Sequence, residues 1–357
     1  MFRPVLLFVA AALISGCATF DYYAHAINGQ LDILARSRPI EDLLNGSAPE
    51  TEAPPAGLRR RLATVLRIRR FATDSLALPD NGSYRDYVEL DRPAVAWNVI
   101  ATPEFSLQPD HWCYPFAGCV PYRGFFARER AQRFADSLRH AGQDVRIAGV
   151  AAYSTLGWFR DPVLSTQLKR DDIDLAALLF HELAHQQLYV PDDAAFNESF
   201  ATFVEREGLR RWLAQEGNAA AFDTWSAGHA RDMRFLALLR EYRHRLDELY
   251  DSGLAVDAMR TAKARVFTEL RAAYQAQRAE WGNDGRYDSW FAQELNNAHL
   301  AGVALYHLHV SAFEALFRDS GQDLRKFYRA ARRLGRLPAE ERNARMSALA
   351  AGTLSAR

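Results

Sequence analysis

Two histidines and a glutamate stand at a spacing that favours metal chemistry. The stretch Leu179–Gln186 contains His181, Glu182 and His185 in the pattern His-Glu-x-x-His. On an α-helix, residues four apart lie one turn apart on the same face, so both imidazoles can reach a single ion. Glu182 would lie beside them, where it can take a proton from a water molecule activated by that ion. The sequence therefore predicts metal-assisted hydrolysis, with His181 and His185 as metal ligands and Glu182 as the general base.

The residues around this motif predict the helix that positions it. Asp171 and Asp172 provide an N-cap, Asp174 falls in the first turn, and Pro191 prevents the helix from continuing. The motif would then lie near the middle of a helix of about eighteen residues. The opposite side of this helix is apolar and would hold it to a core: Leu175, Ala176, Leu179, Leu183 and Ala184.

A third ligand is expected where the chain turns back, because a catalytic zinc site has three protein ligands and one open position. Asp192 and Asp193 predict the start of a second helix over residues 194–206. Counting about six residues on each arm of the turn, at about 1.5 Å per residue, brings Glu198 level with His185. Glu198 is therefore the predicted third ligand.

Other residues are candidates for supporting roles. Glu205 and Asp193 could fix the orientation of the imidazoles through hydrogen bonds, although surface ion pairs are the ordinary role of such carboxylates. Residues 151–158 could form a sheet edge that a peptide pairs with, or an ordinary core strand. The candidates for substrate or transition-state contacts are Tyr153, Tyr306 and Asn296, with His307 and Tyr287 as alternatives. Aromatic residues of this kind more commonly pack in a core, and Asn296 could instead cap a helix.

The N-terminus has the pattern of an export signal. Arg3 precedes the apolar run Val5–Ile14, which is too short to span a bilayer. Leu13–Gly16, followed by Cys17, resembles the bacterial lipobox, and this resemblance implies cleavage before Cys17 and a lipid anchor on the new N-terminus. Ala18 after the cysteine favours the outer membrane, facing the periplasm. The alternative is an uncleaved apolar segment in which the cysteine occurs by chance.

Two further cysteines are consistent with an oxidising compartment. Cys113 and Cys119 enclose a short loop that contains Pro115 and Gly118. We expect a disulfide between them, with two buried free thiols as the alternative. A metal site at this position is not expected, because no second pair of cysteines or histidines is near it in the sequence.

The composition indicates a globular protein. The chain has 357 residues, with 44 Lys and Arg against 44 Asp and Glu, and a mean hydropathy of −0.26. Zero net charge argues against nucleic acid as a partner, and the absence of a second long apolar run argues against a polytopic membrane protein. The expected organisation is a signal peptide over 1–16, a helical segment over 17–80, an α+β sheet region over 81–170 and a helical region over 171–357.

The fold class predicted from these patterns is α+β, with a small mixed or antiparallel sheet region followed by a large helical region that carries the motif helix. The expected elements, in chain order, are helices over 18–78 interrupted at 48–57, strands over 87–90, 95–100 and 145–150, a helix over 123–140, and helices after 171 with breaks at Pro191, Gly208, Gly253, Gly282 and Gly321.

Several stretches together resemble the family of bacterial aminopeptidases with a lipoprotein signal. They are residues 181–185 and 196–201, supported by 112–124, 153–159 and 296–298. The resemblance implies a zincin-like, zinc-dependent peptidase of the gluzincin type, in which two histidines and a glutamate hold the metal. In better known gluzincins this glutamate lies further downstream and is followed four residues later by an aspartate. Here the spacing is shorter, and Thr202 stands at that place.

The function expected from the sequence is a lipid-anchored zinc aminopeptidase that hydrolyses short peptides in the bacterial envelope. One Zn²⁺ per chain is the expected cofactor; peptide substrates and the membrane, through Cys17, are the expected partners. One alternative is a zinc endopeptidase of the envelope. Another is a non-catalytic envelope lipoprotein with a structural metal, but Glu182 would have no purpose in such a closed site.

Overall fold

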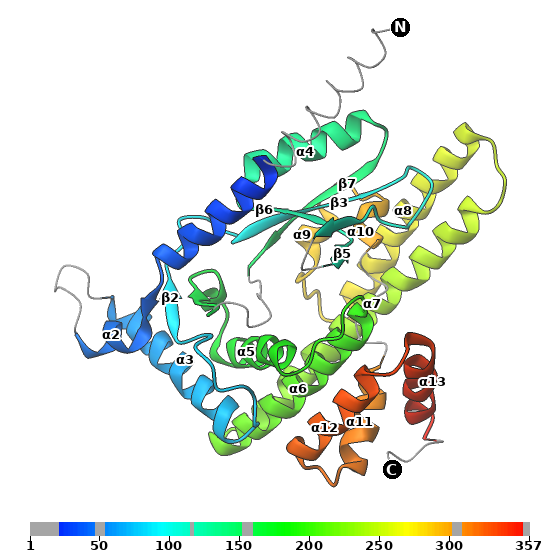
Figure 1. The fold of residues 1–357 in the computed structure, drawn as a ribbon. Coiled ribbons are helices and arrows are strands. Elements are labelled where there is room, and N and C mark those ends of the chain that lie inside the picture. The colour runs from blue at the N-terminus through cyan, green and yellow to red at the C-terminus, as the bar shows by residue number, and fades with distance from the viewer. Residues whose placement is uncertain (1–20, 47–53, 115–117, 152–159, 302–308, 353–357) are drawn as a thin grey trace, which may run out of the picture.

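The computed structural model describes residues 21–46, 54–114, 118–151, 160–301 and 309–352 of the chain. Within these ranges the protein has an α+β fold, in which small sheets are followed along the chain by a large helical region (Figure 1). This confirms the fold class predicted from the sequence.

The strands are short and lie before the motif helix in the chain. They are β1 Arg38–Pro39, β2 Asp86–Val88, β3 Ala96–Thr102, β4 Trp112–Tyr114, β5 Gly118–Val120, β6 Arg123–Phe125, β7 Asp144–Val150 and β8 Val163–Leu164. The helices of the same region are residues 21–35, α2 Ile40–Asn45, α3 Ala56–Asp74, α4 Arg128–His140 and the 3₁₀-helix η2 Gln167–Lys169.

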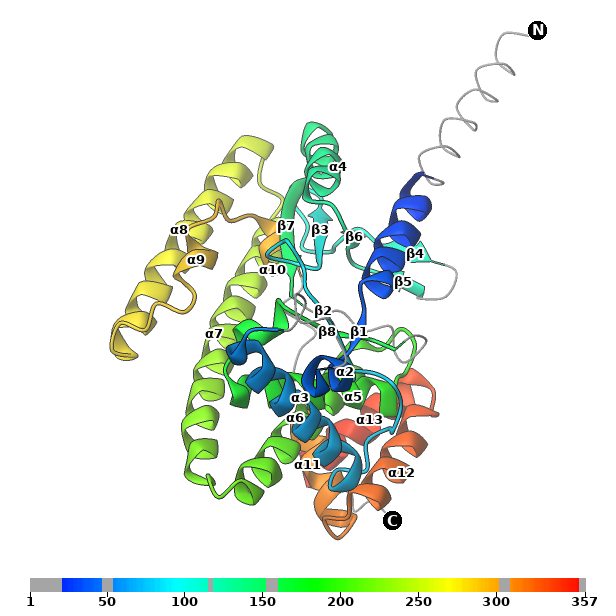
Figure 2. The same ribbon diagram turned by 90° about the vertical axis from the view of Figure 1, so that its left-hand side faces the viewer.

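The remaining described residues are mostly helical. These helices are α5 Asp172–Gln187, α6 Ala194–Gln215, α7 Ala220–Tyr250, α8 Val256–Glu280, α9 Asp288–Phe291, α10 Asn297–Leu300, α11 Val310–Asp319, α12 Leu324–Gly335 and α13 Ala339–Ala350. The long helices α7 and α8 lie side by side along one side of the molecule (Figure 2). The expected breaks at Pro191, Gly253, Gly282 and Gly321 all fall between helices.

Three small sheets account for the strands. The strand β3 pairs antiparallel with β6 and β7, and β2 pairs antiparallel with β1 and parallel with β8. The expected strands over 87–90, 95–100 and 145–150 correspond to β2, β3 and β7. Along β3, the alternate residues Trp97, Val99 and Ala101 are buried in one apolar cluster with residues of α4, as the two-residue period of a strand requires.

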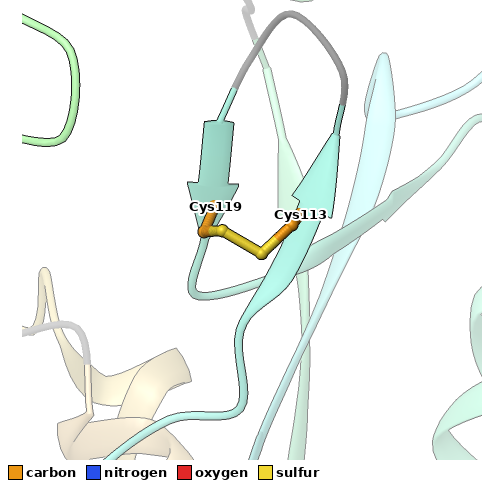
Figure 3. Close-up of a disulfide and its surroundings, with 2 residues drawn as sticks. All are labelled: Cys113 and Cys119. Atoms are coloured by element: carbon orange, nitrogen blue, oxygen red, sulfur yellow. A yellow bond between two sulfur atoms is a disulfide. The ribbon is translucent and has the colours of Figure 1, made fainter.

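The strands β4 and β5 form a hairpin closed by a disulfide. Cys113 and Cys119 lie directly opposite each other in the pairing register, and their sulfur atoms are 1.97 Å apart (Figure 3). The disulfide predicted from the sequence is therefore confirmed.

The largest core lies where α5 and α6 pack together with α3, α11 and α12. Its fully buried aromatic rings include Phe180 and four rings that meet edge to face or stack: Phe196, Phe200, Phe313 and Phe327. Such rings each remove a large apolar area from water. The core therefore holds the motif helix and its neighbour in place from one side.

Two boundaries predicted from the sequence are wrong. The helix expected over 123–140 begins only at Arg128, because Arg123–Phe125 pair with β3 instead. The break expected at Gly208 does not occur, since α6 continues through it to Gln215. A Cβ atom at Gly208 would lie 2.8 Å from Cδ1 of Leu76 and 3.0 Å from Cδ2 of Phe180. Glycine at this position therefore allows close packing and does not end the helix.

None of the helices in the described ranges combines the length and the apolar character that crossing a bilayer requires.

The close approach at Gly208 generates a prediction for stability. Substitution Gly208→Val should lower the free energy of unfolding by about 1–3 kcal/mol, because the new methyl groups would overlap the buried Phe180 ring. Urea unfolding followed by circular dichroism measures this change. The matched control is Gly57→Val in α3, where a Cβ has no neighbour within 4 Å. Equal stability of the two variants would contradict the packing role of Gly208.

Candidate metal centre

The motif helix α5 and the following helix α6 form a hairpin with well-defined ends. The Asp171 carboxylate accepts a hydrogen bond from the backbone N–H of Asp174 at 2.8 Å, and Asp193 accepts one from Phe196 at 2.9 Å. Both are N-caps, which satisfy backbone donors left free at a helix start. Between the helices Asp192 has a left-handed backbone with a φ of 60°. The caps and the turn predicted from the sequence are therefore present.

Three side chains of this hairpin converge. The Nε2 atoms of His181 and His185 are 3.2 Å apart. The Glu198 carboxylate places one oxygen 3.3 Å from Nε2 of His181 and the other 3.7 Å from Nε2 of His185. These three residues form a group that could hold a metal ion. Glu198 thus reaches the position inferred from counting residues around the turn.

The spacing of these donor atoms suits a first-row divalent metal. Ligands about 2.0–2.1 Å from a tetrahedral ion lie about 3.3 Å from one another, close to the distances between these nitrogen and oxygen atoms. Two imidazole nitrogens and one carboxylate are also the ligand set of one type of catalytic zinc site. The residues present therefore fit such an ion in both geometry and chemistry.

Glu205 orients the first of these histidines. Its carboxylate lies 2.9 Å from Nδ1 of His181 and accepts the hydrogen bond that a proton on this nitrogen donates. The Nε2 atom of a neutral His181 then carries the lone pair that faces His185 and Glu198. Of the two residues proposed for this role, Glu205 makes the required contact with His181. Asp193 instead caps α6 and pairs with Arg342 at 2.6 Å.

The surroundings of the two imidazoles shift their pKa values in opposite directions. Burial opposes the charged form of His181, but hydrogen bonds to Glu198 and Glu205 outweigh it and raise the pKa of His181 well above its ordinary value. Burial, together with the nearby His181, lowers the pKa of His185 to about 4. The Nδ1 atom of His185 is buried and has no hydrogen-bond partner in the described part of the chain.

Glu182 lies in an environment that raises its proton affinity. Burial is the largest cause that raises the pKa of its carboxyl group; the positive charge of His181 opposes this, and the carboxylates of Glu198, Asp161 and Glu205 add to it. A carboxyl group with a raised pKa can both accept and return a proton near neutral pH. Glu182 therefore has the properties of a general base and acid.

A cavity of about 520 Å³ lies beside His181 and Glu182, whereas His185 and Glu198 are not among its lining residues. It is lined by His181 and Glu182 from α5, by Glu205 from α6, and by residues of α7. Asp174 and Asp232 contribute carboxylates to the same cavity, and Arg286 pairs with Asp232 at 3.1 Å. The volume falls within the range of small-molecule and peptide sites.

The other predicted site residues are not all brought together here. Tyr153, Tyr306, His307 and Cys17 lie outside the described residues, as does all of the 151–158 segment except Ala151. Tyr287 stacks on Phe235, and its hydroxyl group donates to Asp232, which lines the cavity beside His181.

Asn296 is not among the residues that line the cavity beside His181. It is the N-cap residue of α10, and its side-chain amide donates to the carbonyl oxygen of Val145 at 3.2 Å. Its neighbour Asn297 is buried and accepts a hydrogen bond from the Tyr250 hydroxyl group at 2.6 Å. Both asparagines therefore connect elements of the fold.

Two tyrosines near Glu198 were not among the site residues predicted from the sequence. Both side chains are partly exposed, at 39 % and 42 %; partial desolvation raises the pKa of Tyr122 and of Tyr189, and the negative charge of Glu198 contributes to both shifts. The disulfide hairpin also approaches the α5–α6 turn, since a Cβ atom at Gly118 would lie 3.0 Å from Oδ1 of Asp192. No local pattern predicts this neighbourhood, because Tyr122 and Glu198 are far apart in the sequence.

The fold and the site together define an α+β protein with a candidate metal centre on a two-helix hairpin. The model of the family described as "Putative aminopeptidase" matches residues 21–346, and the chain belongs to this family. The family description indicates a peptidase. No curated protein and no solved structure matches the chain.

The contact between Glu205 and His181 generates a prediction for metal affinity. Substitution Glu205→Gln should weaken the binding of a divalent metal by about 10–100-fold, because the carboxylate that orients the imidazole is lost. Titration with Zn²⁺ against a chelator measures this change. The matched control is Glu207→Gln on the same helix, whose carboxylate pairs with Arg210 and Arg211. Equal affinities of the two variants would contradict the orienting role.

Proposed function

We propose that the protein is a zinc-dependent aminopeptidase that hydrolyses short peptides. The observation that carries the proposal is the convergence of His181, His185 and Glu198, with Glu182 beside them at the edge of a cavity. Membership of the family supports the peptidase class. The donor set and its spacing support a zinc ion, for which His181, His185 and Glu198 would be the ligands.

A zinc ion held there would supply Lewis-acid activation of water and of the peptide carbonyl group. The side chains of the chain itself have separate tasks. Glu205 keeps the proton of His181 on Nδ1, which leaves Nε2 free as a donor to the metal. Glu182 accepts the proton of the attacking water and delivers it to the leaving amine.

The cavity beside His181 supports cleavage at the N-terminal end of a peptide. An aminopeptidase has to hold the free α-amino group of its substrate, which is a cation at neutral pH. The cavity beside His181 is lined by the carboxylates of Asp174 and Asp232, of which Asp232 also pairs with Arg286 at 3.1 Å, and opposite charges at short distance attract. These two groups are the proposed contacts for the substrate amine.

We further propose that the protein is anchored to the bacterial envelope, at the outer membrane facing the periplasm. The pattern that ends at Cys17 supports a lipid anchor. The disulfide between Cys113 and Cys119 is consistent with an oxidising compartment such as the periplasm.

The role of Glu182 can be tested separately from the metal. Substitution Glu182→Gln should lower kcat for a peptide by about 10²–10⁴-fold while zinc stays bound, because the general base is removed and the ligands are kept. Peptide hydrolysis and the zinc content of the purified protein are measured together. The control is Glu314→Gln in α11, whose carboxylate pairs with Arg206 at 3.1 Å. An active, zinc-loaded Glu182→Gln variant would refute the mechanism.

The position of cleavage can be tested with a blocked substrate. A tripeptide with a free N-terminus should be hydrolysed, and its N-acetylated form should react at least about tenfold more slowly, because the acetyl group removes the charge that Asp174 and Asp232 attract. Chromatography of the products measures both rates. Equal rates for the two peptides, with cleavage at an internal bond, would support the zinc endopeptidase alternative.

A further inference from the structure

A second cavity, of about 390 Å³, lies between α4, β7 and the segment around α10. It shares no lining residue with the cavity beside His181. The helix α4 runs along the sheet that contains β7, and α10 contacts β7 as well (Figures 1 and 2). The cavity is therefore a separate feature of the sheet region, and nothing in the proposed hydrolysis uses it.

The walls of this cavity carry an excess of positive charge. Arg128 and Arg139 come from one face of α4, and Arg146 comes from β7, whereas Glu294 is the one carboxylate among the lining residues. We call this feature the basic cavity. Of its three guanidinium groups, that of Arg139 pairs with Asp136 at 2.8 Å. Arg128 and Arg146 form no ion pair with a described residue.

Arg146 is the central residue of the basic cavity. Its Nε atom is buried and has no hydrogen-bond partner within the described ranges. Burial lowers the pKa of Arg146, but a guanidinium group does not lose its proton in a protein, so the side chain stays charged. Arg146 is partly buried, and a partly buried charge without a partner is costly; that cost is relieved when an anion binds beside it.

Among the described residues, the carboxylate of Glu294 lines the same cavity but forms no ion pair with Arg146. His299 is buried, and its Nδ1 atom accepts a hydrogen bond from the backbone N–H of Asn296 at 3.2 Å. Burial and the neighbouring Arg146 lower the pKa of His299 to about 3, so this imidazole is neutral at physiological pH. Gln132 and Gln293 add neutral amide groups. The lining thus combines three cations and one carboxylate with neutral hydrogen-bonding groups.

We propose that the basic cavity binds a small oxyanion, that is, a carboxylate or phosphate group. The planar guanidinium group of Arg146 matches the geometry of two oxygens on one such group. Arg128 and Arg139 add positive charge at the mouth of the cavity, since both are exposed on α4. The ligand can be a free inorganic oxyanion or the terminal carboxylate of a peptide, since both present the same charged oxygens.

The test is calorimetric titration of the full chain with inorganic phosphate and, separately, with N-acetyl-dialanine and its C-terminal amide. We expect one saturable site for an oxyanion probe, with binding at least tenfold weaker in Arg146→Gln. The control Arg133→Gln, on α4 but outside the cavity lining, should change the affinity less than twofold. Binding should persist in His185→Ala, which excludes the metal centre as the site.

The probes distinguish the two sources of the oxyanion. Binding of N-acetyl-dialanine, but not of its amide, would identify a peptide carboxylate; binding of phosphate alone would identify an inorganic anion. If circular dichroism shows that Arg146→Gln is unfolded, the double variant Arg128→Gln with Arg139→Gln replaces it and should weaken binding similarly. The proposal would be overturned if neither phosphate nor N-acetyl-dialanine showed saturable binding. Unchanged binding in folded Arg146→Gln would overturn it as well.

Discussion

The geometry of the metal centre depends on the sharp turn that folds α6 back onto α5. Asn197 holds this turn from inside the core: its side-chain oxygen accepts from the backbone N–H of Val190 at 2.8 Å, and its amide donates to the Val190 carbonyl at 2.7 Å. Arg342 of α13 forms an ion pair with Asp193 at the same turn. Because Glu198 follows Asn197 directly, its position relative to the histidines on α5 is fixed by the bonds that close the turn.

The bonds that fix the α5–α6 turn also explain how several carboxylates are held near two imidazoles. Glu182, Glu198 and Glu205 all add negative charge at His181 or beside it. Such a group is stabilised by a compensating positive charge, which a proton on His181 or a divalent cation can supply at the same place. Metal binding at this centre should therefore release a proton, and the packing of α5 on α6 keeps the carboxylates close together in either state.

The parts of this arrangement that were predictable from the sequence are those encoded by short-range patterns. The caps at Asp171 and Asp193, the proline between the helices and the four-residue spacing of His181 and His185 are local features, so they located the hairpin and, by counting, Glu198. The disulfide followed from the short spacing of Cys113 and Cys119 and from the expected compartment.

Features that depend on contacts between distant segments were not predictable in this way. Gly208 was expected to end a helix. Its role instead depends on close contacts with Leu76, which follows α3, and with Phe180 of α5. Arg123–Phe125 fall within the helix expected over 123–140, yet they pair with the neighbouring strand β3. The environment of Arg146 likewise depends on the fold, in which no carboxylate of the described residues pairs with it.

The disulfide hairpin combines a local sequence feature, two closely spaced cysteines, with a contact between distant segments of the chain. A bridge that closes so small a loop adds less to the stability of a whole domain than one that closes a long loop, so its main effect is on the shape of the hairpin itself. Gly118, with a left-handed φ of 71°, places the hairpin against Asp192 at the α5–α6 turn. The residues that follow the bridge lead directly to Tyr122, whose pKa is raised by burial and in part by the charge of Glu198. The covalent ring therefore constrains a backbone that approaches the α5–α6 turn, and this local effect is larger than its effect on the stability of the whole domain.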